Sequence, residues 1–207
     1  MSEIYIATAI ETDGPAPGPC SMLSLASAAY QRDQTLVSTF SVNLETLPGA
    51  EGDAATVAWW KSKPNAWAVC RHEPEPAAAA IPEYVEWLDH LPGRPVYVGY
   101  PAAAGYAFVS WYLHRFTGRN PFGRGALDLR TMSMVLLGRP YHQSKMRSMP
   151  EAWTHDSPPR TYVALDDALS TGRLFCHMLD AVNALPHANR GDCSASPGPA
   201  LRLKEDD

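Results

Sequence analysis

Three short apolar runs in the first 44 residues constrain the fold more than any other feature of the sequence. They span residues 3–10, 21–30 and 35–44, and short polar or Pro- and Gly-rich breaks separate them. Alternating or β-branched apolar residues in runs of this length, bounded by turn residues, are typical of β-strands. Because the connections are short, the sequence predicts an antiparallel meander.

The spacing of the apolar residues becomes helical after residue 50. Helices are expected over residues 56–71, 77–93, 104–118 and 163–185. The nearly all-apolar run 94–100 predicts a strand buried on both faces, and residues 126–138 begin extended and continue as a helix. The pattern indicates an α/β fold, with a mixed central sheet of an antiparallel meander plus parallel strands flanked by helices.

The length and composition favour one compact domain. The chain has 207 residues, of which 45% are hydrophobic, and we expect the domain over residues 1–185. Residues 186–207 are rich in Pro, Gly, Ser and charge and are predicted to be a disordered tail. Three tryptophans, Trp59, Trp60 and Trp67, are interpreted as packing residues of the core.

The charge and the absence of targeting signals limit the functions to be considered. The net charge of −5 gives no overall attraction to nucleic acid, so such binding would need a local basic groove. The four cysteines lack metal-finger spacing, and no apolar run approaches the ~18 residues of a membrane span. We therefore expect a cytoplasmic protein that does not associate with membranes.

Two motifs rise above this background. ETDGP (residues 11–15) ends the first predicted strand, and ALDDA (residues 164–168) opens the last predicted helix. With the WW…PxAW segment and the order of the elements, they resemble the DEDD superfamily of 3′–5′ exonucleases, which have a ribonuclease H-like fold. The likeness is greatest to a bacterial exoribonuclease-like branch with a similar IETDGPxPGxxSMLS segment. It extends over about residues 4–179.

The resemblance implies a two-metal nuclease chemistry. Two Mg²⁺ or Mn²⁺ ions roughly 3.5–4 Å apart need several converging carboxylates, and a His or Tyr positions the attacking water. The family supplies Asp-x-Glu on the first strand, Asp on a middle helix and Asp on the last helix. Its base is a His five residues before the last Asp, or in another subclass a Tyr four residues before it.

This chain keeps only part of that set. Glu11 matches the Glu of the first motif, and Asp167 matches the last Asp. Ala9 stands at the first Asp position, Gly105 (with Ala104 or Tyr106 as neighbouring alignments) at the second, and Tyr162 at the His. Three departures, rather than one at Ala9, indicate natural divergence and not a single laboratory substitution.

Alternative assignments remain open at this point. Tyr162 lies four residues before Asp166, which meets the spacing of the tyrosine subclass. Asp13 would then replace the missing first Asp, and Thr12, Asp13 and Asp166 are candidate substrate contacts. Ordinary structural roles are the alternative: Glu11 as a carboxylate at the end of a strand, and Asp166 or Asp167 as an acid in the first turn of a helix, where negative charge is favourable. His155 is a replacement base of low prior weight, and Asp128 is expected to be a helix N-cap.

Three hypotheses follow. The leading one is a degenerate exonuclease homologue that binds nucleic-acid 3′ ends, nucleotides or a protein partner without efficient hydrolysis, with Mg²⁺ or Mn²⁺ weakly bound or absent. The second is an active metal-dependent exonuclease, on RNA or DNA, that uses Glu11, Asp13, Asp166 or Asp167 and Tyr162. The third is a protein-interaction module that pairs with itself or with an active relative.

Overall fold

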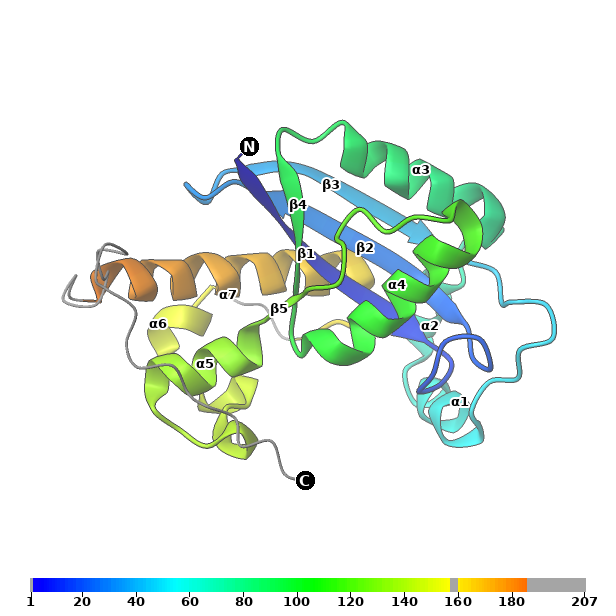
Figure 1. The fold of residues 1–207 in the computed structure, drawn as a ribbon. Helices are drawn as coiled ribbons and strands as arrows, with labels where there is room; N and C mark the ends of the chain where they lie inside the picture. Colours follow the sequence, from blue (N-terminus) through cyan, green and yellow to red (C-terminus); the bar gives the residue numbers. More distant parts are fainter. Residues whose placement is uncertain (1, 157–159, 186–207) are drawn as a thin grey trace, which may run out of the picture.

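A computed structural model describes residues 2–156 and 160–185, which build a five-stranded sheet with helices on both faces (Figure 1). The strand order is β3-β2-β1-β4-β5. The strands are β1 (Glu3–Thr12), β2 (Met22–Tyr30), β3 (Leu36–Asn43), β4 (Arg94–Gly99) and β5 (Leu127–Asp128). The tail predicted for residues 186–207 lies outside the described residues. Among the described residues, no helix is long and apolar enough to span a membrane.

The sheet is mixed, as the sequence predicts. β1 and β2, and β2 and β3, pair antiparallel, whereas β1 and β4, and β4 and β5, pair parallel. In the register of the meander, Ala9 lies opposite Ala26 and Glu11 lies opposite Ser24. Ser24 in turn lies opposite Asn43 of β3, so Glu11, Ser24 and Asn43 form a row across three strands.

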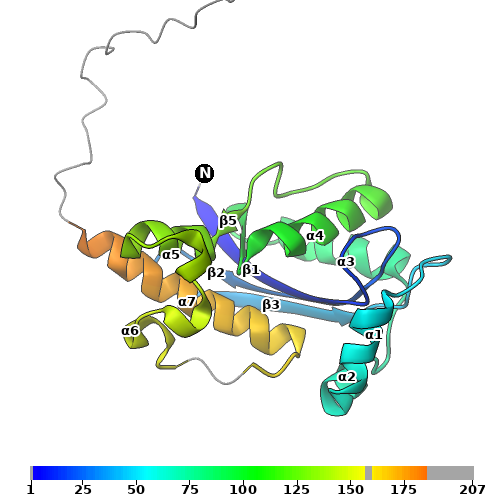
Figure 2. The same cartoon turned by 90° about the horizontal axis from the view of Figure 1, so that it is seen from below.

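Alternation along β1 assigns its side chains to two separate cores. Ile4 and Ile6 pack in one core with α3 (Ala77–Asp89) and α4 (Ala102–Thr117). Tyr5 and Ala7 pack in the other with α7 (Ala164–Ala184). Figure 2 shows the sheet between the layer of α3 and α4 and the layer of α7. Because Ala9 and Glu11 continue the second set, both face α7.

The predicted helix at 56–71 is two helices, α1 (Ala54–Lys61) and α2 (Pro64–Cys70), with Pro64 at the start of the second. Proline is favoured there because a backbone N–H in the first turn of a helix has no partner within the helix, so its absence costs nothing. Trp60 is buried, and its indole N–H donates to the Thr12 carbonyl oxygen at 2.9 Å. Trp59 and Trp67 are both 38% exposed, so their assignment to the core is wrong.

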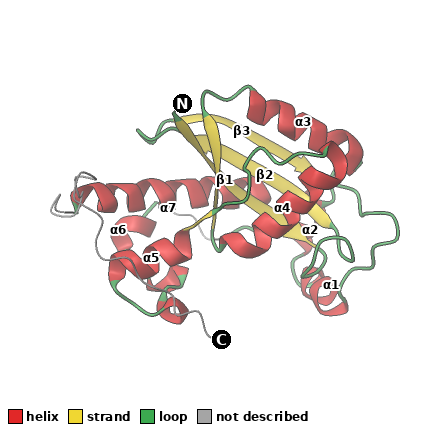
Figure 3. Cartoon of the chain, viewed as in Figure 1, coloured by secondary structure: helices red, strands yellow, loops and turns green. Residues whose placement is uncertain are grey.

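The segment after α4 supports α7 from the side. It comprises α5 (Leu129–Leu137), two 3₁₀ turns at Tyr141–Gln143 and Met146–Ser148, and α6 (Glu151–Thr154). Figure 3 shows the chain with helices in red, strands in yellow and loops in green. The predicted N-cap is confirmed, since the Asp128 carboxylate accepts from the Thr131 N–H at 2.6 Å. The same carboxylate also accepts from the Ala102 N–H at 2.6 Å, which ties the start of α4 to α5.

The approach of α7 to the sheet depends on a glycine. A Cβ atom built on Gly172 would lie 2.1 Å from Cε2 of Tyr30, a buried side chain of β2. Only a residue without a side chain lets the helix lie this close to the strand. The packing of α7 on the sheet also determines where Asp166 and Asp167 lie, because both are in the first turn of this helix.

We predict that Gly172→Ala destabilises the protein, although alanine is the better helix former. Overpacking a core costs about 1–3 kcal/mol, which exceeds the ~1 kcal/mol gained in helix propensity. Urea unfolding measures the change, with Asn183→Ala, an exposed position on the same helix, as the control. Unchanged or increased stability of Gly172→Ala would contradict this packing.

Candidate active site

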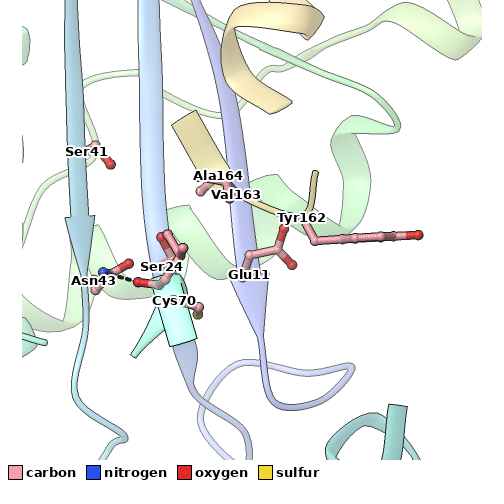
Figure 4. A pocket seen from close by; sticks show the side chains of 9 residues that line it. Glu11, Ser24, Ser41, Asn43, Cys70, Tyr162, Val163 and Ala164 are labelled. Carbon is pink, nitrogen blue, oxygen red and sulfur yellow. Dashed lines mark hydrogen bonds between the residues drawn. The ribbon is translucent and has the colours of Figure 1, made fainter. Parts of the chain in front are cut away.

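A small pocket lies where β1, α2 and the start of α7 meet (Figure 4). Its floor is the row Glu11, Ser24 and Asn43, and Cys70 of α2 lies on one side. Its volume is about 70 Å³, enough for a few water molecules but not for a nucleotide. The remaining lining residues are Ser41, Val69, Tyr162, Val163 and Ala164.

Glu11 is a buried acid without a partner among the described residues. Its side chain is on the α7 face, the residue is 6% exposed, and its Oε1 accepts no hydrogen bond there. Burial raises the pKa of Glu11 from its ordinary value near 4.5 to about 8, and the nearby Arg160 only partly opposes this. The negative charge of Asp167 adds to the increase, which places the two carboxyl groups within electrostatic reach of each other.

Asp167 is brought to Glu11, but it already has a cationic partner. Its Oδ2 accepts from Nε of Arg160 at 2.9 Å, with the Asp167 side chain only 15% exposed. Burial raises the pKa of Asp167, and the Arg160 charge acts against this. Asp166 is held separately, since its Oδ2 accepts from the Thr161 hydroxyl at 2.9 Å. Adjacent helical positions diverge by about 100°, so the two acids serve different contacts.

Tyr162 does not join the two carboxyl groups. Its ring points away from Glu11 in Figure 4. It packs edge-on to Trp59, with ring centroids 5.0 Å apart, and lies beneath the guanidinium of Arg160 at 4.8 Å. Its φ of 59° is in the left-handed region, which a non-glycine residue seldom adopts. The structure therefore gives Tyr162 no place as a base for water beside Glu11.

Asp13 and Thr12 organise the turn after β1. Oδ1 of Asp13 accepts from the Ser21 N–H at 2.5 Å, and the Asp13 side chain is buried. The Thr12 hydroxyl donates to the Gly14 carbonyl oxygen at 2.9 Å. Asp13 is thus used within the loop and does not substitute for the acid missing at position 9.

The positions at which the family has its first and second Asp hold the small residues Ala9 and Gly105. Ala9 lies against a buried alanine cluster of Ala26, Ala164 and Ala168. A Cβ atom on Gly105 would lie 2.7 Å from the Tyr97 hydroxyl oxygen. The neighbouring alignments offer no acid either: Ala104 is exposed, and the Tyr106 hydroxyl donates to the Gly123 carbonyl at 2.5 Å.

Several pocket residues were not anticipated from the sequence. Ser24 and Asn43 lie in the pocket because the strand register places them in line with Glu11. The sequence would predict this only if the pairing of β1, β2 and β3 were already known. No motif in the sequence indicates Arg160, which the structure brings to Asp167. Cys70 is a protonated thiol, since burial raises its pKa to about 12 and the nearby Glu11 adds to the effect.

No family model matches the sequence. The chain is 28% identical over 134 residues to the 3′–5′ DNA exonuclease Cap18 of Escherichia coli, covering 63% of this chain and 67% of that protein. The nuclease domain of 3′hExo, a DEDDh family member bound to rAMP, has a TM-score of 0.67 at 12% identity and covers 86% of this chain and 92% of that chain.

A third relative is a metal-bound structure. The Mg²⁺- and Mn²⁺-bound form of Pop2p from S. pombe has a TM-score of 0.61 at 10% identity, covering 84% of this chain and 82% of that chain. The chain therefore has the ribonuclease H-like fold of the DEDD-type 3′–5′ exonucleases, with a mixed sheet flanked by helices.

The residues present do not fit a two-metal centre. Such a centre needs carboxylates from several elements around both ions. Among residues 2–156 and 160–185, no three ligand atoms of His, Cys, Asp or Glu converge around Glu11. The two retained acids are a buried group that favours its neutral form and a carboxylate paired with Arg160.

We predict that Glu11→Gln stabilises the protein increasingly as pH rises. The pKa of Glu11 is higher in the folded protein, about 8, than in the unfolded chain, about 4.5. The stability that this difference contributes is fully present below pH ~4.5 and is lost as pH rises through about 8, because the buried carboxyl group must then ionise. The difference between variant and wild type should reach a few kcal/mol at pH 9. Urea unfolding from pH 4 to pH 9 measures it, with the exposed Glu86→Gln as the control. Parallel pH profiles for Glu11→Gln and wild type would contradict a buried neutral acid.

We also predict strong coupling between Gly105 and Tyr97. Gly105→Ala should cost about 1–3 kcal/mol in wild type, because the buried Tyr97 ring has little room to move. In a Tyr97→Phe background, the same change should be neutral or stabilising. Additive effects in this double-mutant cycle would show that Tyr97 does not occupy the space next to position 105.

Proposed function

We propose that this protein is a degenerate 3′–5′ exonuclease homologue that binds the 3′ end of single-stranded nucleic acid, or a nucleotide, without efficient hydrolysis. The observation that carries the proposal is the Arg160–Asp167 pair at 2.9 Å. It places a guanidinium on Asp167, one of the two acids that the sequence shares with the family's metal-binding set. Mg²⁺ or Mn²⁺ would have to displace Arg160 and remove the proton of Glu11, so we propose weak binding or none.

The missing carboxylates matter for the rate as well as for affinity. Two-metal hydrolysis depends on stabilising both the attacking and the leaving oxygen. Removing a single group from such an electrostatic site commonly lowers the rate by two to three orders of magnitude. Ala9 and Gly105 supply no ligand, and Tyr162 faces away from Glu11, so three contributions to catalysis are lost together.

Nucleic-acid binding is supported by an aromatic patch beside the pocket, formed by Trp59, Lys63, Arg160 and Tyr162. Two cations lie near the Tyr162 ring: the Lys63 ammonium is 5.3 Å from the ring centroid, and the Arg160 guanidinium is 4.8 Å from it. Trp59 is 38% exposed and lies edge-on to Tyr162. In proteins that bind single strands, exposed aromatic rings stack on the bases and neighbouring cations attract the phosphates.

The local charge of this patch answers the objection raised by the net charge of −5. The likeness to a 3′–5′ DNA exonuclease and to a nuclease domain bound to rAMP supports a nucleotide or strand end as the ligand. The pocket of about 70 Å³ is too small for a base, so the terminal base would stack on the patch. A cytoplasmic location remains a prediction from the sequence.

The absence of hydrolysis is tested with single-stranded DNA and RNA in the presence of Mg²⁺ or Mn²⁺. We predict that the wild-type protein shortens these strands no faster than an Asp167→Asn variant does under the same conditions. Metal-dependent trimming at about 1 s⁻¹ or faster, abolished in Glu11→Gln and Asp167→Asn, would overturn the proposal in favour of an active exonuclease.

Binding is tested by fluorescence anisotropy with a 5′-labelled oligonucleotide that carries a free 3′ hydroxyl. Trp59→Ala should weaken binding roughly 5- to 150-fold, the range for loss of one stacked base. Tyr141→Ala is the matched control, since Tyr141 is also exposed and also lies beneath an arginine, Arg130. Equal affinities for all three proteins, or no binding at low salt, would contradict the aromatic patch and leave the interaction-module hypothesis.

A further inference from the structure

A second cluster of metal-ligating side chains lies away from the pocket, on the middle of α7. His155 ends α6, Asp156 follows it, and His177 extends from α7 towards both. His177 is ten positions beyond Asp167, which is about 15 Å along a helix. Among the described residues, no hydrogen bond joins these three side chains to the residues of the pocket.

The ligand atoms of the three side chains already converge. They lie within 4.8 Å of one another, and Nε2 of His177 is 3.1 Å from Oδ1 of Asp156. Zinc bonds of 2.0–2.1 Å in tetrahedral geometry place ligand atoms about 3.3 Å apart. The His177–Asp156 pair therefore has the required spacing, and small side-chain rotations of His155 would bring the third atom to it.

The surroundings hold the rings in place. Nδ1 of His155 lies 3.3 Å from the Ala152 carbonyl oxygen, and a bond of this kind orients metal-binding histidines by fixing the proton on that nitrogen. The rings of His155 and His177 have centroids 5.0 Å apart. Trp153 is buried in the core beneath α7 and anchors α6 there, while the neighbouring Cys176 faces the same core and is not a ligand.

We propose that His155, Asp156 and His177 form a binding site for a divalent transition-metal ion, with Zn²⁺ as the best match. Two imidazoles and one carboxylate suit Zn²⁺, whereas Mg²⁺ prefers oxygen ligands alone. Three protein ligands leave a fourth position for water or an external group. The ion connects the end of α6 to the middle of α7, and so stabilises the face of the helix opposite the sheet.

The proposal is tested by Zn²⁺ competition titration against a chromogenic chelator, using the full chain. We expect one Zn²⁺ per chain at this site, and binding at least tenfold weaker in both His155→Gln and His177→Gln. His142→Gln, a change at an exposed histidine of the 3₁₀ turn, should leave affinity unchanged. His155 is itself exposed, so its variant remains informative if His177→Gln unfolds.

A second readout separates a metal site from a simple His–Asp ion pair. Zn²⁺ should raise the thermal unfolding midpoint of wild type and His142→Gln by several degrees, and leave His155→Gln unchanged. Absence of Zn²⁺ binding, or binding that survives in both His155→Gln and His177→Gln, would overturn the proposal. In that case the cluster is a metal-free ion pair between His177 and Asp156.

Discussion

The close packing of α7 on β1 and β2 is the interaction on which the rest of the structure depends. It relies on small residues: Gly172 against Tyr30, and Ala164 and Ala168 against Ala9 and Ala26. This contact fixes the first turn of the helix over the end of β1 and sets Asp167 within electrostatic reach of Glu11. The same contact packs the half-buried Ala9 against Ala164 and Ala168, at the position where the family has its first Asp.

The candidate site holds a positively charged side chain of its own beside one of the acids that it shares with the family. Arg160 contributes the positive charge beside Asp167, and Glu11 balances its burial by favouring the protonated form. On the other face of β1, the Tyr97 hydroxyl fills the space beside Gly105. We infer that these contacts act together, because a buried carboxylate is costly unless it is protonated or paired.

The sequence predicts the fold well because alternation and helical spacing are local properties. The meander, the buried fourth strand, the Asp128 cap and the position of the last helix all depend on residues close together in the chain. The site is less predictable because its decisive contacts are between distant segments. Arg160 reaches Asp167 through a loop, Tyr162 turns outwards from a left-handed backbone conformation, and Trp59 is exposed although Trp60 beside it is buried. None of these has a periodic signal.

We propose that Glu11 and Asp167 do not form a two-metal centre, and Mn²⁺ binding followed by electron paramagnetic resonance tests this most directly. The full chain and Asp167→Asn would be titrated with Mn²⁺ up to millimolar concentration. The account predicts no bound ion whose affinity depends on Asp167, and no spin-coupled pair of ions. Two coupled Mn²⁺ ions in wild type, lost together in Asp167→Asn, would contradict it.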